Sequence, residues 1–526
     1  MKISFASSLL WCAAMALSGP AQAESSADGQ RCLANMDVPC AQQVVASLSD
    51  STDKTYLEAA LAFHTGEFAR AEALMGSLAG KVQEDNEDAW KRGLALYQAT
   101  RDATEGMVTA RRGDVEVRYD PNGTDLVLVD EAIETLQAAH DRIGPLLGGA
   151  PPGMIRVEIY PTADRFIAAS SLPVESVRRT GVVAISKWTR LLVTSPRALG
   201  RGYAWRDTLS HEYIHYIVAW RTKDLTPVWL QEGIARAYEG MWHADELSPL
   251  PPFQQTLLAD ALATDTLVTT EEIGGSIAFM SSADRAALAY AQLSTKVSYL
   301  RKAAGKDALA RVLDRIRDGT EASQALADVA TAGSLAAFEL GWKADLESLH
   351  LVQRKLASMP TVLGTPTDDF AIDPVLSGRR DLAGHVRLGD LLMEAKRPDA
   401  ALLEYQAGMP PLEPASPLLS ARLARVLLAL DREDEAIATL RASIGDYPDM
   451  PITRKLLGER LLARGMRQEA LAEYRAGADV NPFDPDVQAA LADLYAALGQ
   501  SELAARHARY RRILDVGGAP LDGEDG

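Results

Sequence analysis

Hydrophobic and polar positions change their period several times along the 526-residue chain. Between residues 110 and 200 they alternate or form short apolar runs, as strands do, and one longer stretch has the spacing of an amphipathic helix. The link Lys187-Trp188-Thr189 is short enough to join the last two strands as a hairpin. The pattern predicts a helix at 128–148 and strands at 114–120, 154–161, 180–186 and 190–196.

A second pattern repeats near the end of the chain. The alanines at 401, 436, 470 and 504 are 35, 34 and 34 residues apart, and a leucine followed by a small residue recurs in step with them. This period resembles the tetratricopeptide repeat, in which each unit is a pair of antiparallel helices. Another kind of helical hairpin array is the alternative. We expect a linker rich in Pro, Thr, Asp and Gly at 357–381, repeats at 382–515 and a disordered tail at 516–526.

The first residues have the features of a targeting segment. A basic start at Lys2 precedes an apolar run that is too short to be a convincing membrane span, and Ala21-Gln22-Ala23 is a small-x-small cleavage signal. We therefore expect residues 1–23 to be a signal peptide and the mature chain to lack a transmembrane segment. Export to the bacterial periplasm is the prediction, with secretion as the alternative.

Helical spacing also marks the start of the mature chain. Residues 24–108 are expected to be helical and partly tetratricopeptide-like, with Gly66 and Phe68 where a repeat turn would place them. In an exported protein the pair Cys32 and Cys40 favours a disulfide, and two reduced thiols are the alternative.

The charge balance narrows the classes of partner. The formal net charge is −18, which argues against nucleic acid because phosphate binding needs a basic face. Neither GxGxxG nor GxxxxGK[ST] occurs, so no phosphate-binding loop is expected.

The strongest chemical signal is SHEYIHY at 210–216. On a helix, His211 and His215 share one face, close enough for both imidazoles to bind one ion. Glu212 is offset around the helix and is the candidate general base. A second helix, PVWLQEGIARAYEG, brings Glu232 as a third ligand, with Gly233 leaving room to pack on the first helix. One Zn²⁺ per chain is the predicted cofactor, and two helix-face histidines with an exposed glutamate are the alternative.

These two helices resemble those of the gluzincin zinc metallopeptidases, and more closely those of the peptidase MA-like family. The family pairs an HExxH helix with a (W/P)LxEG(I/L)A helix, matched here by residues 211–215 and 229–235. The similarity covers about 110–350 and implies a thermolysin-like zinc metallopeptidase domain at 109–356. The expected fold class is therefore α+β, with a small mixed sheet and HExxH helices followed by an all-α superhelix.

The resemblance also implies a mechanism, in which zinc activates water and Glu212 moves its proton to the leaving amine. Tyr290 is the predicted oxyanion donor, although packing in the core explains it equally well. Asp207 has two interpretations, orienting a ligand histidine or stabilising the start of the helix. By analogy, the strand at 180–186 is an edge that pairs with an extended substrate.

Two functions follow from this organisation. The first is an exported zinc peptidase whose repeats bind a protein partner or deliver a protein or peptide substrate. The second is a catalytically inactive periplasmic scaffold with a vestigial metal domain, in which the repeats do the work. Intact ligands and base favour the first.

Overall fold

The structure is a computed structural model. The predicted signal peptide at 1–23 lies outside the residues it describes, as do most of the predicted tail at 516–526 and part of the linker at 357–381. Among the described residues, no helix combines the length and the apolar character needed to cross a membrane. The described residues are 25–274, 277, 280–349, 351, 354–360, 362, 364, 370–409 and 416–517.

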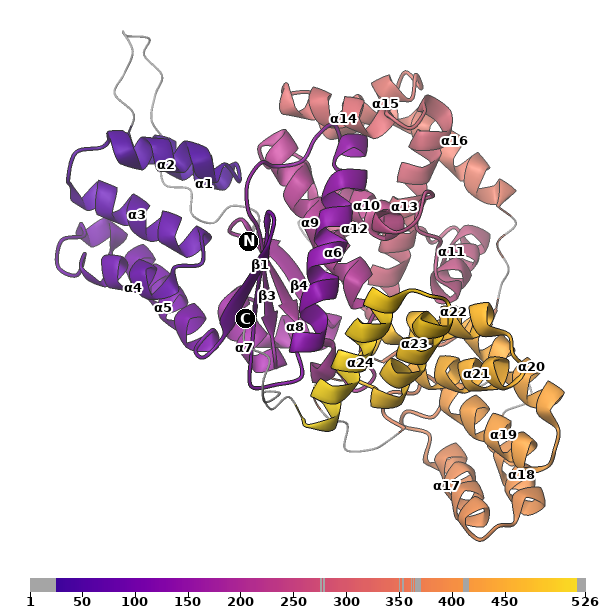
Figure 1. The fold of residues 1–526 in the computed structure, drawn as a ribbon. Helices are drawn as coiled ribbons and strands as arrows, with labels where there is room; N and C mark the ends of the chain where they lie inside the picture. The colour runs from indigo at the N-terminus through magenta and orange to yellow at the C-terminus, as the bar shows by residue number, and fades with distance from the viewer. Residues whose placement is uncertain are drawn as a thin grey trace.

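The chain begins with a group of paired helices, seen at the left of Figure 1. Ser25 caps the first helix by accepting from the backbone of Asp28, whose carboxylate accepts in return. The predicted disulfide between Cys32 and Cys40 is confirmed. The helices are α1 (Ser26–Ala34), α2 (Val38–Ser47), α3 (Thr52–His64), α4 (Phe68–Gly76) and α5 (Glu87–Ala103).

A five-stranded sheet follows, in the order β1-β2-β3-β5-β4. The two outer pairs are antiparallel and the two inner pairs are parallel, so the sheet is mixed and β4 lies at its edge. The strands are β1 (Val108–Arg112), β2 (Val115–Tyr119), β3 (Ile155–Tyr160), β4 (Ala184–Lys187) and β5 (Arg190–Thr194).

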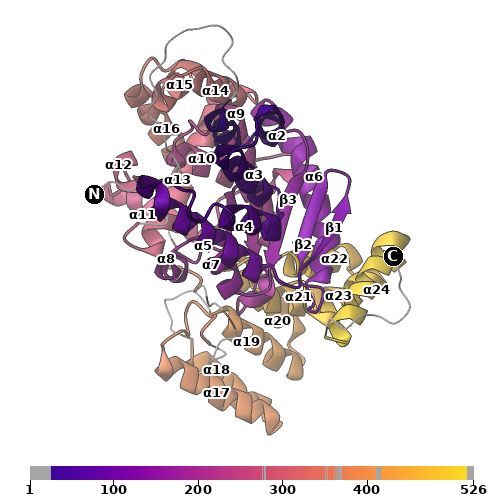
Figure 2. The same cartoon turned by 90° about the vertical axis from the view of Figure 1, so that its left-hand side faces the viewer.

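Helices cover both faces of the sheet. Alternate residues of β3 point to opposite faces, so Val157 joins the core beneath α6 and α9, whereas Tyr160 packs on Phe166 of α7. Figures 1 and 2 show this arrangement from two sides. The covering helices are α6 (Leu126–Ile143), α7 (Ala163–Ser170), α8 (Val174–Thr180), α9 (Trp205–Thr222) and α10 (Val228–Tyr238). The next helices are α11 (Pro252–Thr264), α12 (Thr270–Ile273), α13 (Ala283–Ala304), α14 (Ala308–Arg317), α15 (Ala322–Val329) and α16 (Leu335–Ser348).

Two predicted elements differ from the observed ones, and one observed strand has no predicted counterpart. The helix expected at 128–148 ends at Ile143, because Pro145 cannot continue it and starts a 3₁₀ turn. The strand expected at 180–186 begins only at Ala184, since α8 occupies the residues up to Thr180 and Gly181 ends that helix with a φ of +67°. Strand β1 was not predicted.

The β4–β5 hairpin ties the first helices to the sheet. Its two turn residues, Trp188 and Thr189, have φ of +52° and +56°, as a two-residue turn of this hand requires. The Trp188 ring packs edge-on against Phe63, and the Thr189 hydroxyl donates to the carbonyl of His64 at 3.1 Å. The hairpin is therefore held at its tip by α3.

Eight helices in four antiparallel pairs form the repeat arm at the lower right of Figure 1. A side chain at Gly389 would place Cβ 2.3 Å from the ring of Tyr405, so the small residue lets paired helices approach closely. The helices are α17 (Arg380–Glu394), α18 (Pro398–Ala407), α19 (Pro417–Ala429), α20 (Glu433–Asp446), α21 (Pro451–Ala463), α22 (Arg467–Ala478), α23 (Pro485–Ala497) and α24 (Ser501–Asp515).

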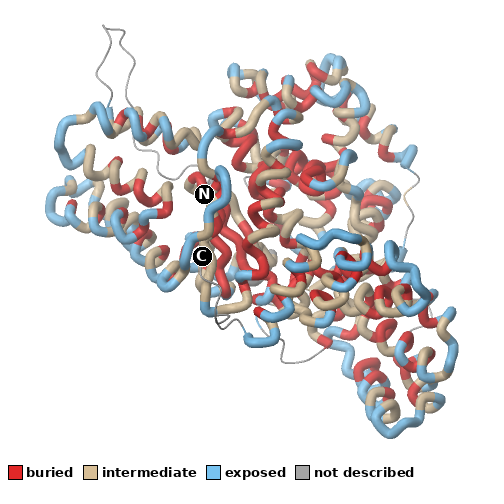
Figure 3. Tube along the Cα trace, viewed as in Figure 1, coloured by how far each residue is buried: buried red, intermediate tan, exposed pale blue. Residues whose placement is uncertain are grey.

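The end of the arm returns to the central unit. Tyr510 and Ile513 of α24 belong to the same buried cluster as the sheet and α6. Figure 3 colours buried residues red, and many of them lie in the strands and the helices packed on them. On the rim, Arg506 donates to Glu134 of α6 at 2.8 Å, and Arg509 pairs with Asp130. The arm is therefore packed against the sheet-bearing unit at its C-terminal end.

Candidate metal centre

Two helices form the candidate centre, and the turn between them determines how they meet. Helix α9 ends at Thr222, after which Lys223 and Asp224 have φ of +53° and +58° and reverse the chain. Pro227 is extended and precedes the first turn of α10. The two helices contact each other along their length, so residues seventeen positions apart in sequence come face to face.

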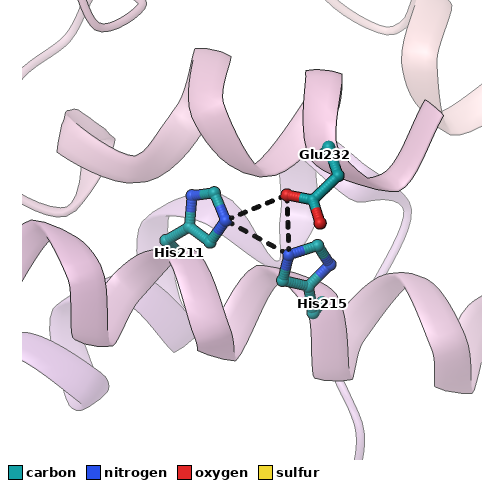
Figure 4. A group of neighbouring side chains, drawn as sticks. All are labelled: His211, His215 and Glu232. Carbon is teal, nitrogen blue, oxygen red and sulfur yellow. Dashed lines mark hydrogen bonds and ion pairs between the residues drawn. The ribbon is translucent and has the colours of Figure 1, made fainter. Parts of the chain in front are cut away.

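Figure 4 shows three side chains from these helices pointing at one another. The Nε2 atoms of His211 and His215 are 3.2 Å apart, and Glu232 Oε2 lies 3.5 Å from each of them. The structure thus brings together the three predicted ligands. Among the described residues, these three form a group whose ligand atoms lie close enough to hold one metal ion.

This triangle fits a tetrahedral zinc ion. Ligand distances of ~2.0–2.1 Å at tetrahedral angles place pairs of ligand atoms ~3.3–3.4 Å apart. The observed separations of 3.2, 3.5 and 3.5 Å bracket that value. In addition, Glu232 Oε2 is buried without a hydrogen-bond donor, which is costly for a carboxylate unless a cation supplies the missing interaction. Two imidazole nitrogens and one carboxylate oxygen suit zinc and leave a fourth position open.

A fourth residue, Glu239, orients one ligand. Its Oε2 lies 3.0 Å from Nδ1 of His211, and Arg236 pairs with its other oxygen. A carboxylate at Nδ1 holds the proton there, so Nε2 keeps the lone pair that faces the other two ligands. Glu239 is buried, and the sequence reasoning missed it. The available signal was its position seven residues after Glu232, two turns further along the same face.

Asp207 does not take this orienting role. Its Oδ1 accepts from the indole of Trp242 at 2.8 Å and lies 3.6 Å from His243. Because Asp207 stands in the first turn of α9, the interpretation that remains is stabilisation of the helix start.

Glu212, the predicted base, is buried beside the triangle, with 8% of its surface exposed. Burial raises the pKa of its carboxyl, whereas the neighbouring histidines and a hydrogen bond from the backbone of Ser186 act in the opposite direction. Ser186 belongs to β4, so the candidate base lies between the two histidines and the edge of the sheet.

Tyr290 lies on α13, which packs against α10. Burial raises the pKa of its hydroxyl well above the ordinary value, and the carboxylates of Glu232 and Glu212 add to the effect, while its ring packs against a hydrophobic cluster of α11, α13 and α16. The close approach depends on Gly233, whose added Cβ would lie 2.9 Å from the carbonyl oxygen of Leu293. The sequence prediction that Gly233 packs on the first helix was therefore wrong, because the tight contact is with α13.

Comparison with known protein families finds a match for the part of the chain that contains the candidate metal centre. Residues 137–348 match the family model of the Peptidase MA superfamily. The match runs from within α6 to the end of α16 and includes both helices of the candidate centre. Among curated proteins, none matches the chain.

Similar solved structures are helical and distant. MamA from Desulfovibrio magneticus RS-1 shows 17% identity and a TM-score of 0.24, covering 27% of this chain and 81% of its own. PilF of Pseudomonas aeruginosa shows 12% identity and a TM-score of 0.24, covering 44% and 95%. The APC/C hetero-tetramer Cut9–Hcn1 has the same identity and TM-score and covers 93% of both chains. The repeat architecture rests on the helix pairs themselves and not on these similarities.

Proposed function

We propose that the chain is an exported zinc-dependent peptidase of the gluzincin type, built on a thermolysin-like scaffold and acting in the periplasm. The observation that carries the proposal is the triangle of His211, His215 and Glu232, whose dimensions fit one zinc ion, with a buried glutamate beside it. A vestigial domain has no need to keep an orphaned carboxylate oxygen in its interior.

The residues around the centre have distinct tasks in this proposal. A bound zinc ion would acidify a water molecule and polarise the scissile carbonyl. Glu212 accepts the proton of the attacking water and delivers it to the leaving amine, for which its raised pKa is suited. Tyr290 donates a hydrogen bond to the developing oxyanion. Glu239 keeps the His211 ring in the ligating tautomer.

The edge strand provides a place for an extended substrate. Lys187 and Arg190 close the hairpin as partners, so the backbone groups of Ser186 point away from β5, toward α9. The backbone groups of Ala184, two residues earlier, point away from β5 as well. An extended peptide can therefore pair with β4 as a further strand beside Glu212. The repeat arm would bind a protein partner or a protein substrate.

The test combines metal analysis with one substitution. Purified wild type should hold about one zinc per chain, which a chelator removes. Glu212→Gln should keep the zinc and lower hydrolysis of unfolded protein substrates by at least ~100-fold. Glu246→Gln changes an exposed carboxylate of the same unit and should leave the rate unchanged. Zinc-free wild type would support the scaffold function instead, and full activity of Glu212→Gln would eliminate Glu212 as the base.

The same variant can identify the substrate. Inactive Glu212→Gln retains the metal site, so periplasmic proteins that bind as substrates should be recovered with it and released unchanged. Those proteins should be cleaved by wild type in a purified mixture, which separates substrates from partners held by the arm.

A further inference from the structure

A second cavity lies away from the metal centre, where the loop before α9 meets the repeat arm. Its volume is about 230 Å³, and it is lined by Arg201, by apolar side chains at the starts of α19, α21 and α23, and by Asn481 and Asp484. This volume is below the range of roughly 300–1,000 Å³ typical of sites for drug-sized ligands, so it suits a small group. The apolar lining includes Leu418, Met450, Ile452 and Val487.

Arg201 is the unusual feature of this cavity. Its Nε is buried without a hydrogen-bond acceptor, and none of the described residues forms an ion pair with its guanidinium. Burial lowers its pKa, and among the described residues the carboxylate that acts on it electrostatically is Asp449, which is exposed. Arg201 is half-buried and its guanidinium cannot lose its charge, so its buried Nε lacks an acceptor that an anion in the cavity would supply.

The loop holds Arg201 in place on both sides. The N–H of Gly200 donates to the carbonyl of Val362 at 3.0 Å, and that of Tyr203 donates to Val480 at 3.1 Å. Gly202 has a φ of +79°, and a side chain there would place Cβ 2.1 Å from the Val480 oxygen. The contact with the arm therefore requires glycine, and the position of Arg201 is set by the arm and the linker together.

A second source of positive potential borders the same cavity. Helix α21 begins at Pro451 without a side-chain cap, whereas Ser416 caps α19 and Asp484 caps α23. The first N–H groups of a helix and its dipole favour an anion. Asp484 is already paired with Lys455 at 2.9 Å, so it does not neutralise Arg201.

We propose that this cavity binds a single carboxylate carried on an aliphatic group, as found at the C-terminus of a peptide ending in Leu, Ile or Val, or in a short branched fatty acid. The carboxylate pairs with Arg201, and the aliphatic group contacts Met450, Ile452 and Val487. The site is independent of the metal centre and goes beyond the proposed peptidase activity.

The test uses the full chain carrying Glu212→Gln, so that no probe is cleaved. A fluorescein-labelled Gly-Ala-Gly-Ala-Leu peptide with a free C-terminus should bind, and its C-terminal amide should bind about 10- to 100-fold more weakly. Arg201→Gln should lose the same factor, and Arg201→Lys should lose less. Arg425→Gln, an exposed arginine of the arm, is the matched control and should bind as the parent does. Equal binding of acid and amide, equal binding by Arg201→Gln, or no binding of the free acid would overturn the proposal.

Two further measurements separate the possible sources and sites. Displacement of the peptide by 3-methylbutanoate, or binding of that acid alone, supports a site that accepts small acids. Binding should persist after zinc is removed; loss of binding on chelation would assign the carboxylate to the metal centre and overturn the proposal while leaving the proposed peptidase intact. Because no described residue forms an ion pair with Arg201, Arg201→Gln should not lower the thermal midpoint of unfolding, whereas a structural role would require that it does.

Discussion

Two histidines in this protein have opposite surroundings. Both His64 and His211 lie away from bulk water, and burial by itself lowers the pKa of an imidazole. Burial and the charge of Arg190 lower the pKa of His64 to about 3, whereas the neighbouring carboxylates of Glu232 and Glu239 outweigh burial at His211 and raise its pKa to about 10. One histidine stands in a cationic cluster and the other in an anionic one.

The two clusters differ in how their charges are satisfied. Arg190 is fully buried, pairs with Glu158 through one nitrogen at 2.6 Å and lies over the rings of Phe63 and Phe68, while its Nε and Nη2 have no hydrogen-bond acceptor. At the other cluster Glu232 keeps a buried oxygen without a donor. The comparison teaches that the Arg190 cluster pairs a buried cation with a buried carboxylate of the chain, whereas the His211 cluster gathers a carboxylate and two imidazoles as a cation site would.

The largest expected effect is the loss of the metal when a ligand is removed. Glu232→Ala should weaken zinc binding at least ~1,000-fold, more than the 10- to 100-fold typical of residues behind the ligands. Zinc per chain after dialysis, followed by competition with a chromogenic chelator, measures this. Affinity equal to wild type would eliminate Glu232 as a ligand and remove the contrast between the clusters.

Breaking the structural cluster should instead reduce stability. Arg190→Met leaves Glu158 as a buried, partly unpaired carboxylate, so the free energy of unfolding should fall by about 3–5 kcal/mol. Denaturant titration of the zinc-loaded protein measures the change. Adding Glu158→Gln to this variant should recover part of the loss, because it removes the uncompensated charge. Zinc content of the folded variant should stay at one per chain; a loss would show that the two clusters are coupled.

Substitution of Glu239, which contacts Nδ1 of His211, should have an intermediate effect on zinc affinity. Glu239→Gln keeps the size of the side chain but weakens the hydrogen bond at Nδ1, and zinc affinity should fall about 10- to 100-fold. The matched control is Asp207→Asn, which alters the Trp242 contact at the start of the same helix and should retain wild-type affinity. If Asp207→Asn lost more zinc affinity than Glu239→Gln, Asp207 and not Glu239 would orient His211.

The smallest expected effect is a loss of stability at acidic pH that is caused by His64. Its folded pKa of about 3 is below the ordinary 6.5, so the unfolded chain binds the extra proton and stability falls as pH drops below 6.5. Its contribution is complete above pH 6.5 and should decrease by about 1–2 kcal/mol between pH 6.5 and 5. His64→Asn should unfold with a weaker pH dependence than wild type in this range. Parallel pH curves for His64→Asn and wild type would contradict the environment described here.

Some of the fold could be read from local patterns and some could not. The period of the repeats and the strands at β2, β3 and β5 are local, because side chains two or 3.6 residues apart share a face. The boundary between α8 and β4 was missed because β-branched and apolar residues around Gly181 fit both states. The Gly233 contact with α13 was missed because a glycine marks a close approach without naming its partner.

Much of the candidate site was visible in the sequence for the same local reason. The spacing of His211 and His215 puts two nitrogen ligands on one helix face, and Glu212 falls beside them. Glu239 was not found, since a glutamate two turns beyond Glu232 is as compatible with a solvent-exposed face as with a buried contact. Arg201 gave no signal at all, because one arginine in a loop says nothing about what surrounds it.

The sequence by itself determined the helix that carries the two histidines, the helical repeats and the cysteine pair, because each depends on spacing over a few residues or on a regular period. Only the tertiary structure decided that Glu232 and Glu239 reach the same imidazole from the next helix and the turn after it, that Arg190 is buried among aromatic rings, and that Arg201 enters the arm without a partner. These features depend on contacts between segments far apart in the chain, whose distances follow from how all the elements pack and not from any local pattern.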